Sequence, residues 1–271
     1  SLEAAEAART EFKGTSVLGD FFKGKFQHIE FPKQDEPDRQ IGDKFLAKLE
    51  DFLKDNVKPL DIERNDKIPD EIIKGLFRIG AFSIKIPKEY GGLGLSQTNY
   101  LRALELISSY STAIAILVSG HLSIGLTQSL KVSYALAKAD NNEYEIKKTQ
   151  AQMAKYYPQL AKDSISAFAL TEKEAGSEPG RIETIARRNP QNSGWLLNGE
   201  KLWTTNGTIA RYIVVIAKAE EEYTAFIVDA HSKGFKAKRL FFHGLSGIEN
   251  AEIELSNVFV SDAAVLGKKG D

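Results

Sequence analysis

The chain has 271 residues, 42% of them hydrophobic and 27% charged, which is long enough to bury a core as one large domain or two smaller ones. Its 36 Lys and Arg residues balance 37 Asp and Glu residues, so the formal net charge of -1 gives no chain-wide attraction for nucleic acid or an anionic membrane. There is no cysteine, which excludes disulfides, thiolate catalysis and cysteine-ligated metal sites within the chain.

The first residues are a polar and aromatic lead-in, to which we assign residues 1–40. This lead-in has no initiating Met and no apolar signal-peptide region, so it is interpreted as a cut or processed start. From residue 41 the apolar residues recur at helical spacing, and Pro59 closes this first helix. A second helix is predicted after Pro69, and Ser96 is the expected N-cap of a third.

Two further helices are predicted before the pattern changes near residue 164. Residues 112–126 are the most apolar stretch of the chain. They contain His121 and are too short to span a bilayer, so they predict a buried helix and no transmembrane segment. A charged stretch at 138–148 leads into the last helix, and we assign residues 41–163 to a helical N-terminal domain.

Residues 164–271 are typical of strands separated by turns. Asn198 and Gly199 lie between two strand-like runs, and such a pair is the strongest short signal for a β-hairpin. Because helices come first and strands second, the order favours segregated layers over alternating βαβ units. The predicted fold class is therefore α+β, with an all-α N-terminal domain followed by an antiparallel β-barrel or sandwich domain. Further β-rich segments lie at 212–217, 223–228 and 252–260.

Most motifs of catalytic sites are missing. Residues 91–94, Gly-Gly-Leu-Gly, precede a helix but lack the spacing and the βαβ unit of a dinucleotide-binding turn, so a plain loop is expected. No Gly-x-Ser-x-Gly pattern surrounds Ser123 near His121, which favours a hydrogen-bonded buried histidine over a catalytic one. No metal-ligand spacing relates the histidines, so no metal site is predicted. They are His28, His121, His231 and His243.

Two segments rise above this background, at residues 167–177 and 202–207. The first is an apolar strand running into Thr-Glu-Lys-Glu-Ala-Gly-Ser, where glycine lets the backbone approach a ligand and adjacent N–H groups suit phosphate oxygens. The second, Leu-Trp-Thr-Thr-Asn-Gly, places a large flat aromatic beside two hydroxyls, which suits a planar ring with polar edges. Taken alone, each segment is more often a β-turn with a core Trp, so residue types leave ligand binding open.

Together the two segments resemble the signatures of the acyl-CoA dehydrogenase family. Residues 168–177 look like the family's apolar strand followed by Thr-Glu-x-x-Ala-Gly-Ser, and residues 197–207 are similar to its second signature. The lead-in at 21–25 and the segment 120–125 look most like the very-long-chain branch. Three shorter segments occur in family-like order, at 87–94, 155–158 and 257–260.

The resemblance implies an FAD site built from both segments. Thr171, with the backbone of 168–170, would meet the polar edge of the isoalloxazine ring. Trp203 would pack on the flavin, and Thr205 would hydrogen-bond near its N5 edge. Ser177 would contact the FAD pyrophosphate and lie near the acyl-CoA substrate. The expected cofactor-binding residues are Phe168, Ala169, Leu170, Thr171, Gly176, Ser177, Trp203, Thr204 and Thr205, with Ser177 also expected to bind substrate.

The resemblance also implies an activity, which is FAD-dependent α,β-dehydrogenation of long-chain fatty acyl-CoA thioesters in β-oxidation. Electrons would leave through an electron-transfer flavoprotein, and the complete protein would be a homodimer or tetramer in the bacterial cytoplasm or the mitochondrial matrix. The family's catalytic glutamate lies in a C-terminal four-helix domain, which we expect to be absent from this chain. We therefore assign no residue here as the base, and we expect the isolated chain to be inactive.

Two alternatives to this function stay open. An acyl-CoA oxidase or a flavin monooxygenase would use the same fold, and oxygen consumption or peroxide production would separate it from a dehydrogenase. A non-catalytic assembly or binding module would lack the catalytic carboxylate and would not bind flavin.

Overall fold

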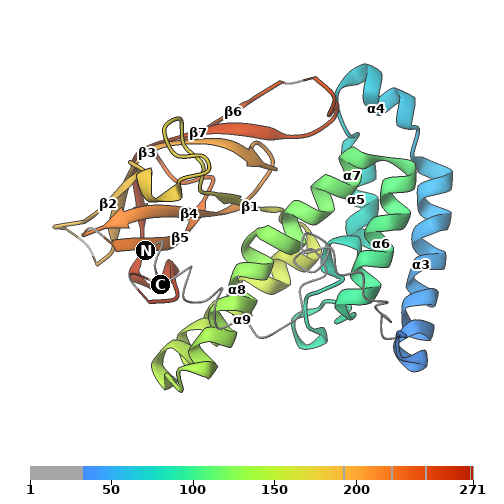
Figure 1. The fold of residues 1–271 in the computed structure, drawn as a ribbon, viewed down its shortest axis with the longest axis horizontal. Helices are drawn as coiled ribbons and strands as arrows, with labels where there is room; N and C mark the ends of the chain where they lie inside the picture. The colour runs from blue at the N-terminus through green and yellow to red at the C-terminus, as the bar shows by residue number, and fades with distance from the viewer. Residues whose placement is uncertain (1–32, 192, 221, 242, 269, 271) are drawn as a thin grey trace, which may run out of the picture. The chain divides into compact units, whose positions relative to one another are not determined.

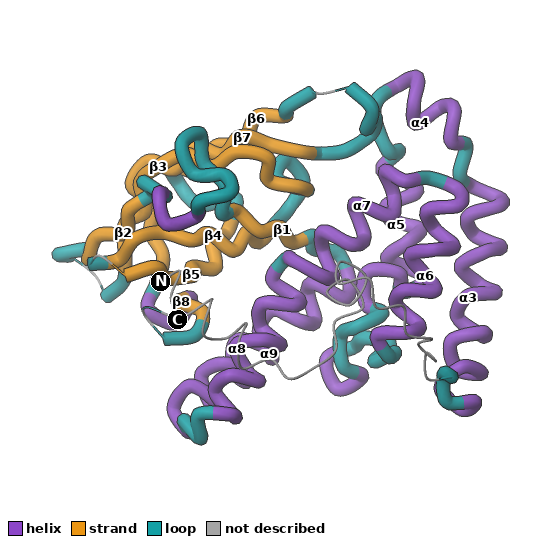
Figure 2. Tube along the Cα trace, viewed as in Figure 1, coloured by secondary structure: helices purple, strands orange, loops and turns teal. Residues whose placement is uncertain are grey.

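The computed structural model describes residues 33–191, 193–220, 222–241, 243–268 and 270. Most of the expected lead-in, including the segment 21–25, lies outside these residues. Residues 36–271 form one compact unit. Within this unit the helices gather on one side and the strands on the other (Figures 1 and 2).

The helical part begins as the apolar spacing predicts. Phe45, Leu49 and Leu53 lie on the buried face of the first helix, and Pro59 starts the next one. The Ser96 hydroxyl accepts the backbone N–H of Asn99 at 3.2 Å, which confirms the predicted N-cap. The helices are α3 (Glu36–Asn56), α4 (Pro59–Asn65), α5 (Asp70–Ile79), α6 (Gln97–Tyr110), α7 (Thr112–Ser119), α8 (Leu126–Ala139) and α9 (Glu143–Lys162), with short turns η1 (Ala81–Ser83) and η2 (Lys88–Tyr90).

The apolar helix expected from residue 112 is interrupted. A π-helical turn, η3 (Gly120–Ile124), follows α7, and extended backbone at Gly125 separates it from α8. A Cβ atom on Gly125 would lie 2.5 Å from the Ser166 hydroxyl, so this close approach requires glycine. By length and composition Thr112–Ala139 could cross a membrane, yet 61% of its most apolar window is buried inside the protein. That burial is typical of a core helix.

The strands form one mixed sheet, where an antiparallel one was predicted. Their order is β6-β7-β3-β2-β4-β5-β8, and β1 pairs with β4. Both β1 and β2 run parallel to β4. Along the chain, β3 comes between each of these strands and β4, and such a long connection allows parallel pairing. The strands are β1 (Ser166–Ala169), β2 (Ile185–Arg188), β3 (Trp195–Thr205), β4 (Tyr212–Ala219), β5 (Glu222–Asp229), β6 (Phe235–Arg239), β7 (Asn250–Val260) and β8 (Val265–Leu266), with short turns η4 (Pro179–Arg181) and η5 (Asp262–Ala264).

The hairpin predicted at Asn198 and Gly199 is wrong, because β3 continues through both residues. The register between β3 and β7 shifts here, so the pair occupies a β-bulge. The Asn198 side chain bonds both the backbone N–H and the side chain of Asn257, at 2.9 and 3.1 Å. Gly199 has a φ of 150°, and a Cβ atom there would lie 2.5 Å from the Thr184 hydroxyl. The Asn-Gly pair therefore allows a close strand contact rather than a chain reversal.

One buried imidazole joins the helical layer to β1. The Nδ1 atom of His121 accepts the backbone N–H of Ser166 at 3.0 Å. Its Nε2 atom therefore carries the proton and donates to the Phe82 carbonyl at 3.1 Å. Burial lowers the pKa of His121 to about 4. The predicted hydrogen-bonded buried histidine is confirmed.

Candidate functional site

The two motif segments, far apart in the sequence, lie side by side. The backbone N–H of Leu202 donates to the Thr171 carbonyl at 2.8 Å. The Lys201 ammonium donates to the Leu170 carbonyl at 3.0 Å. The loop that follows β1 is therefore held against the end of β3, as a site built from both motifs requires.

Trp203 presents a large aromatic ring on an unusual backbone. Its φ is 57°, in the left-handed region, and the residue is 53% exposed. That conformation costs about 1–2 kcal/mol for a residue with a Cβ atom. The register between β3 and β7 shifts between Lys201 and Thr204, and a bulge re-aims the side chains it carries. A strained residue that exposes an indole ring is a reason to infer a ligand there.

The remaining expected strand residues divide between surface and core. Phe168, Thr171 and Thr205 are half-buried and can contribute side-chain atoms to a site. Ala169 and Thr204 are each 1% exposed, so their side chains face the interior. The buried Thr204 hydroxyl has no hydrogen-bond partner among the residues that the structure describes. Leu170 is half-buried, and its carbonyl is already bonded to Lys201.

Gly176 and Ser177 lie on an exposed loop beyond the first motif strand. The base of this loop is closed by reciprocal backbone hydrogen bonds between Glu172 and Ala175, at 3.1 and 3.3 Å. A Cβ atom on Gly176 would meet nothing within 4 Å, so there is open space beside the backbone. In the described part of the chain no hydrogen bond joins Ser177 to β3. The first half of the motif is thus hydrogen-bonded to Lys201 and Leu202 of β3, whereas Gly176 and Ser177 are exposed.

A buried ion pair joins the two signature segments and was not predicted. The Lys201 ammonium lies 2.6 Å from the Glu172 carboxylate, and their side chains are 0% and 7% exposed. Burial acts to raise the pKa of Glu172, but the hydrogen bonds from Glu183 N–H, Lys201 and Thr184 outweigh it, and the pKa is lowered. An ionised carboxylate that is held this way cannot serve as a general base. One signal was available in the sequence, because Lys201 continues the inward-facing alternation of Trp195 and Leu197.

The helical layer closes one side of this region. Asn206 is 1% exposed and donates its side-chain amide to the Leu117 carbonyl at 3.0 Å. A Cβ atom on Gly120 would lie 3.1 Å from the Thr205 methyl group. The end of α7 is therefore packed directly against the residues that follow Trp203.

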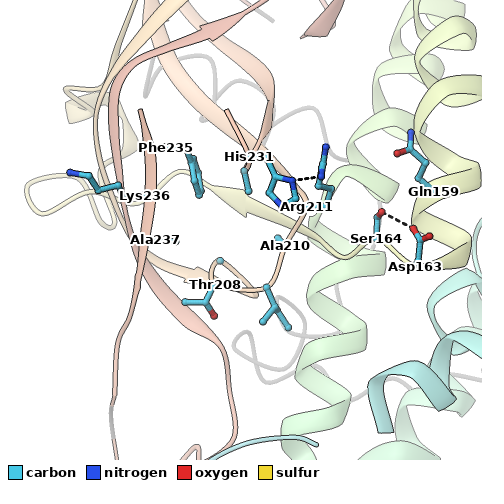
Figure 3. A pocket seen from close by; sticks show the side chains of 13 residues that line it. Gln159, Asp163, Ser164, Thr208, Ala210, Arg211, His231, Phe235, Lys236 and Ala237 are labelled. Carbon is cyan, nitrogen blue, oxygen red and sulfur yellow. Dashed lines mark hydrogen bonds between the residues drawn. The ribbon is translucent and has the colours of Figure 1, made fainter. Parts of the chain in front are cut away.

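A separate groove of ≈ 690 Å³ lies between the end of α9, the turn 207–211 and β6 (Figure 3). None of the expected cofactor residues lines it. Arg211 contacts His231 and donates to the Asp229 carboxylate at 2.7 Å, and Ser164 donates to Asp163 at 2.9 Å. Because these polar side chains already bond to their neighbours, we assign no ligand to this groove.

Two family models match the chain in the regions that carry the motifs. The model for the acyl-CoA dehydrogenase N-terminal domain matches residues 42–134, and the model for the middle domain matches residues 167–258. A probable acyl-CoA dehydrogenase of Mycobacterium tuberculosis is 36% identical over 99% of this chain. The mitochondrial very long-chain specific acyl-CoA dehydrogenase of Mus musculus is 29% identical over 97% of it. The chain spans 40% of the length of each of these relatives.

The fold agrees with these sequence matches. The crystal structure of an acyl-CoA dehydrogenase from Bacillus anthracis complexed with FAD superposes with a TM-score of 0.73 and 28% identity, covering 89% of this chain and 39% of that one. Both matched domains are present in the observed order, helices first and sheet second. The chain belongs to the acyl-CoA dehydrogenase family, of which it carries the N-terminal and middle domains.

Proposed function

We propose that this chain forms one side of the FAD and acyl-CoA sites of an acyl-CoA dehydrogenase that oxidises long-chain fatty acyl thioesters in β-oxidation. The observation that carries the proposal is the exposed indole of Trp203, held on left-handed backbone directly after Leu202, whose N–H bonds the Thr171 carbonyl. The relatives named acyl-CoA dehydrogenase and the FAD-complexed neighbour support it. The very long-chain relative supports the substrate class.

The residues present fit a planar ligand with polar edges. Trp203 would pack on the ring, while the half-buried hydroxyls of Thr171 and Thr205 would meet its edges. Gly176 leaves open space where the loop backbone and Ser177 would meet the phosphates and the substrate. Bound FAD would supply the two-electron acceptor for the oxidation.

Dehydrogenation removes a proton from the α-carbon and a hydride from the β-carbon of the thioester. A carboxylate within hydrogen-bond reach of the α-proton would act as the base. Glu172 is unsuitable because it is buried in its ion pair. We propose that the base lies in the part of the family's sequence that this chain does not cover, and that residues 1–271 alone give no turnover. The same proposal includes an electron-transfer flavoprotein as electron acceptor and a homo-oligomeric assembly.

The test of the activity is an anaerobic titration of the full-length gene product with palmitoyl-CoA. A yellow protein that loses its flavin absorbance on addition of the thioester supports the dehydrogenase. A yellow protein that stays oxidised with thioesters of every chain length contradicts it. Peroxide formation during aerobic turnover would favour an acyl-CoA oxidase, and a protein that takes up no FAD would favour a binding module.

The two tryptophans allow a test of the site itself. Trp203 is 53% exposed, whereas Trp195 is 2% exposed in the core. We expect FAD to quench the fluorescence of Trp203 on binding, so Trp203→Phe should abolish most of the quenching. Trp195→Phe is the matched control and should retain it. Equal quenching in both variants would show that FAD does not bind at Trp203.

A further inference from the structure

The Glu172–Lys201 ion pair connects four segments of the chain. Besides Lys201, the Glu172 carboxylate accepts the backbone N–H and the hydroxyl of Thr184 at 3.1 and 2.5 Å. It also accepts the Glu183 N–H at 2.5 Å. Lys201 in turn donates to the Leu170 carbonyl. One cluster of polar contacts thus joins the end of β1, the motif loop, the start of β2 and the middle of β3.

Stability alone gives a weak account of this pair. Removing two charges from water is expensive, and well-packed apolar residues in place of a buried ion pair are often equally or more stabilising. What hydrogen-bonded charges provide beyond apolar packing is direction. Each contact here fixes the position of one segment along its neighbour.

The position that is fixed is the one the proposed site needs. The ammonium of Lys201 holds the Leu170 carbonyl, one residue before Thr171. The next residue of β3, Leu202, bonds the Thr171 carbonyl at 2.8 Å, and Trp203 follows directly. A shift of the loop by one residue would therefore break both hydrogen bonds and move Thr171 relative to the strand that carries Trp203.

We propose that Glu172 and Lys201 are positioning residues that set the register between the motif loop and β3, and so hold Thr171 and Trp203 in place for FAD. The inference rests on the proposed function for its ligand. It is independent of that function for the register, which is a property of the chain without FAD.

The experiment compares the full-length protein with a variant in which the pair is neutral, Glu172→Gln with Lys201→Met. The double change avoids leaving one charge buried without its partner, which is the damaging case. The matched control is Lys236→Met with Glu254→Gln, an exposed cross-strand pair whose side chains are 71% and 49% exposed. Hydrogen exchange is measured without FAD on peptides covering 170–176 and 200–206, together with the melting temperature and FAD affinity.

In the neutral-pair variant we expect the Leu202 amide to exchange at least about tenfold faster than in the wild type, because hydrogen bonds to charged groups are lost. FAD affinity should fall at least about tenfold by the same loss of order. The melting temperature should remain near the wild-type value, and the control should change none of the three. A purely structural pair would instead lower the melting temperature and leave exchange at the motifs no faster than elsewhere.

If the neutral-pair variant has the same exchange rates and the same FAD affinity as the wild type, the inference is overturned. If that variant fails to fold, Thr184→Val removes only the hydroxyl that Glu172 accepts, and it should move exchange and affinity in the same direction by a smaller factor. A wild-type protein that binds no FAD would overturn the proposed function. The exchange comparison would then still decide whether the pair sets the register.

Discussion

The two ends of β3 are built on opposite principles, although each carries a tryptophan. Trp195, at the start of the strand, is buried, lies edge-on to Phe226 and donates its indole N–H to Asp262 at 3.0 Å. Trp203, near the end, is exposed on left-handed backbone. The first end maximises packing, whereas the second gives up local stability to present a ring. The difference shows that one continuous strand can combine a tightly packed residue with a strained, exposed one of the same type.

The largest expected effect tests the packed end of the strand. Trp195→Ala should lower the free energy of unfolding by about 3–5 kcal/mol, because it empties a buried aromatic site. Trp203→Ala, the matched change at the other end, should alter it by less than about 1 kcal/mol. Urea denaturation followed by circular dichroism measures both. Equal losses in the two variants would end the distinction between the two ends.

The second effect uses pH to probe the buried contact of His121 with β1. His121 has a pKa of about 4 in the folded protein and about 6.5 when unfolded, so the unfolded chain binds the extra proton first as the pH falls. The contribution of the neutral imidazole to the free energy of unfolding is fully present above pH 6.5. It should decline towards pH 4, by about 3 kcal/mol in total. Denaturation midpoints across this range measure the slope, and His121→Asn should flatten it.

Glu172 should contribute only at the acidic end of that window. The pKa of Glu172 is lowered in the folded state, so the stability it provides is present above its unfolded value and is lost only at more acidic pH. A slope between about pH 6.5 and 5.5 that persists in His121→Asn would show that another group titrates there.

The third effect lies midway along β3. Gly199→Ala should lower the free energy of unfolding by roughly 1–3 kcal/mol, because the new Cβ atom would meet Thr184 at a φ of 150°. Gly176→Ala is the control, since nothing lies within 4 Å of its Cβ position. Thermal melts of the two variants give the difference. A tolerated alanine at 199 would mean that the bulge can relax.

The smallest expected effect is a gain in stability. Trp203→Asn should raise the free energy of unfolding by up to about 1 kcal/mol, because asparagine tolerates left-handed backbone better than tryptophan does. FAD affinity should fall at the same time if the exposed ring serves the flavin. Urea denaturation of the FAD-free protein is the measurement. A clear loss of stability would indicate that the indole packs as a structural residue.

Much of the fold followed from local signals. The apolar stripes of α3 and α5, the Ser96 cap and the β-rich segments after residue 164 depend on neighbours within a few residues, and these predictions are confirmed. The hairpin at Asn198 and Gly199 failed because a bulge and a turn favour the same residues. The break at 120–124 depends on room beside Ser166, which no local pattern reports.

The candidate site divides in the same way. The motifs identified the candidate cofactor-binding residues. That the two motif segments lie side by side could be expected from the family resemblance alone. The buried pair of Glu172 and Lys201, the left-handed backbone of Trp203 and the burial of Thr204 depend on contacts across the sheet. Of these, only the lysine at an inward strand position leaves a trace in the sequence.

The position of His121 between the helices and the sheet has a consequence for dividing the chain into fragments. Both of its nitrogens are used, one by the backbone before α6 and the other by the first residue of β1. Asn206 adds a second such link to Leu117. Cutting the chain near residue 164 would leave donors and acceptors on both pieces without partners in a newly opened interior. The helices and the sheet should therefore melt in one cooperative transition, and neither should survive as an independent folding unit.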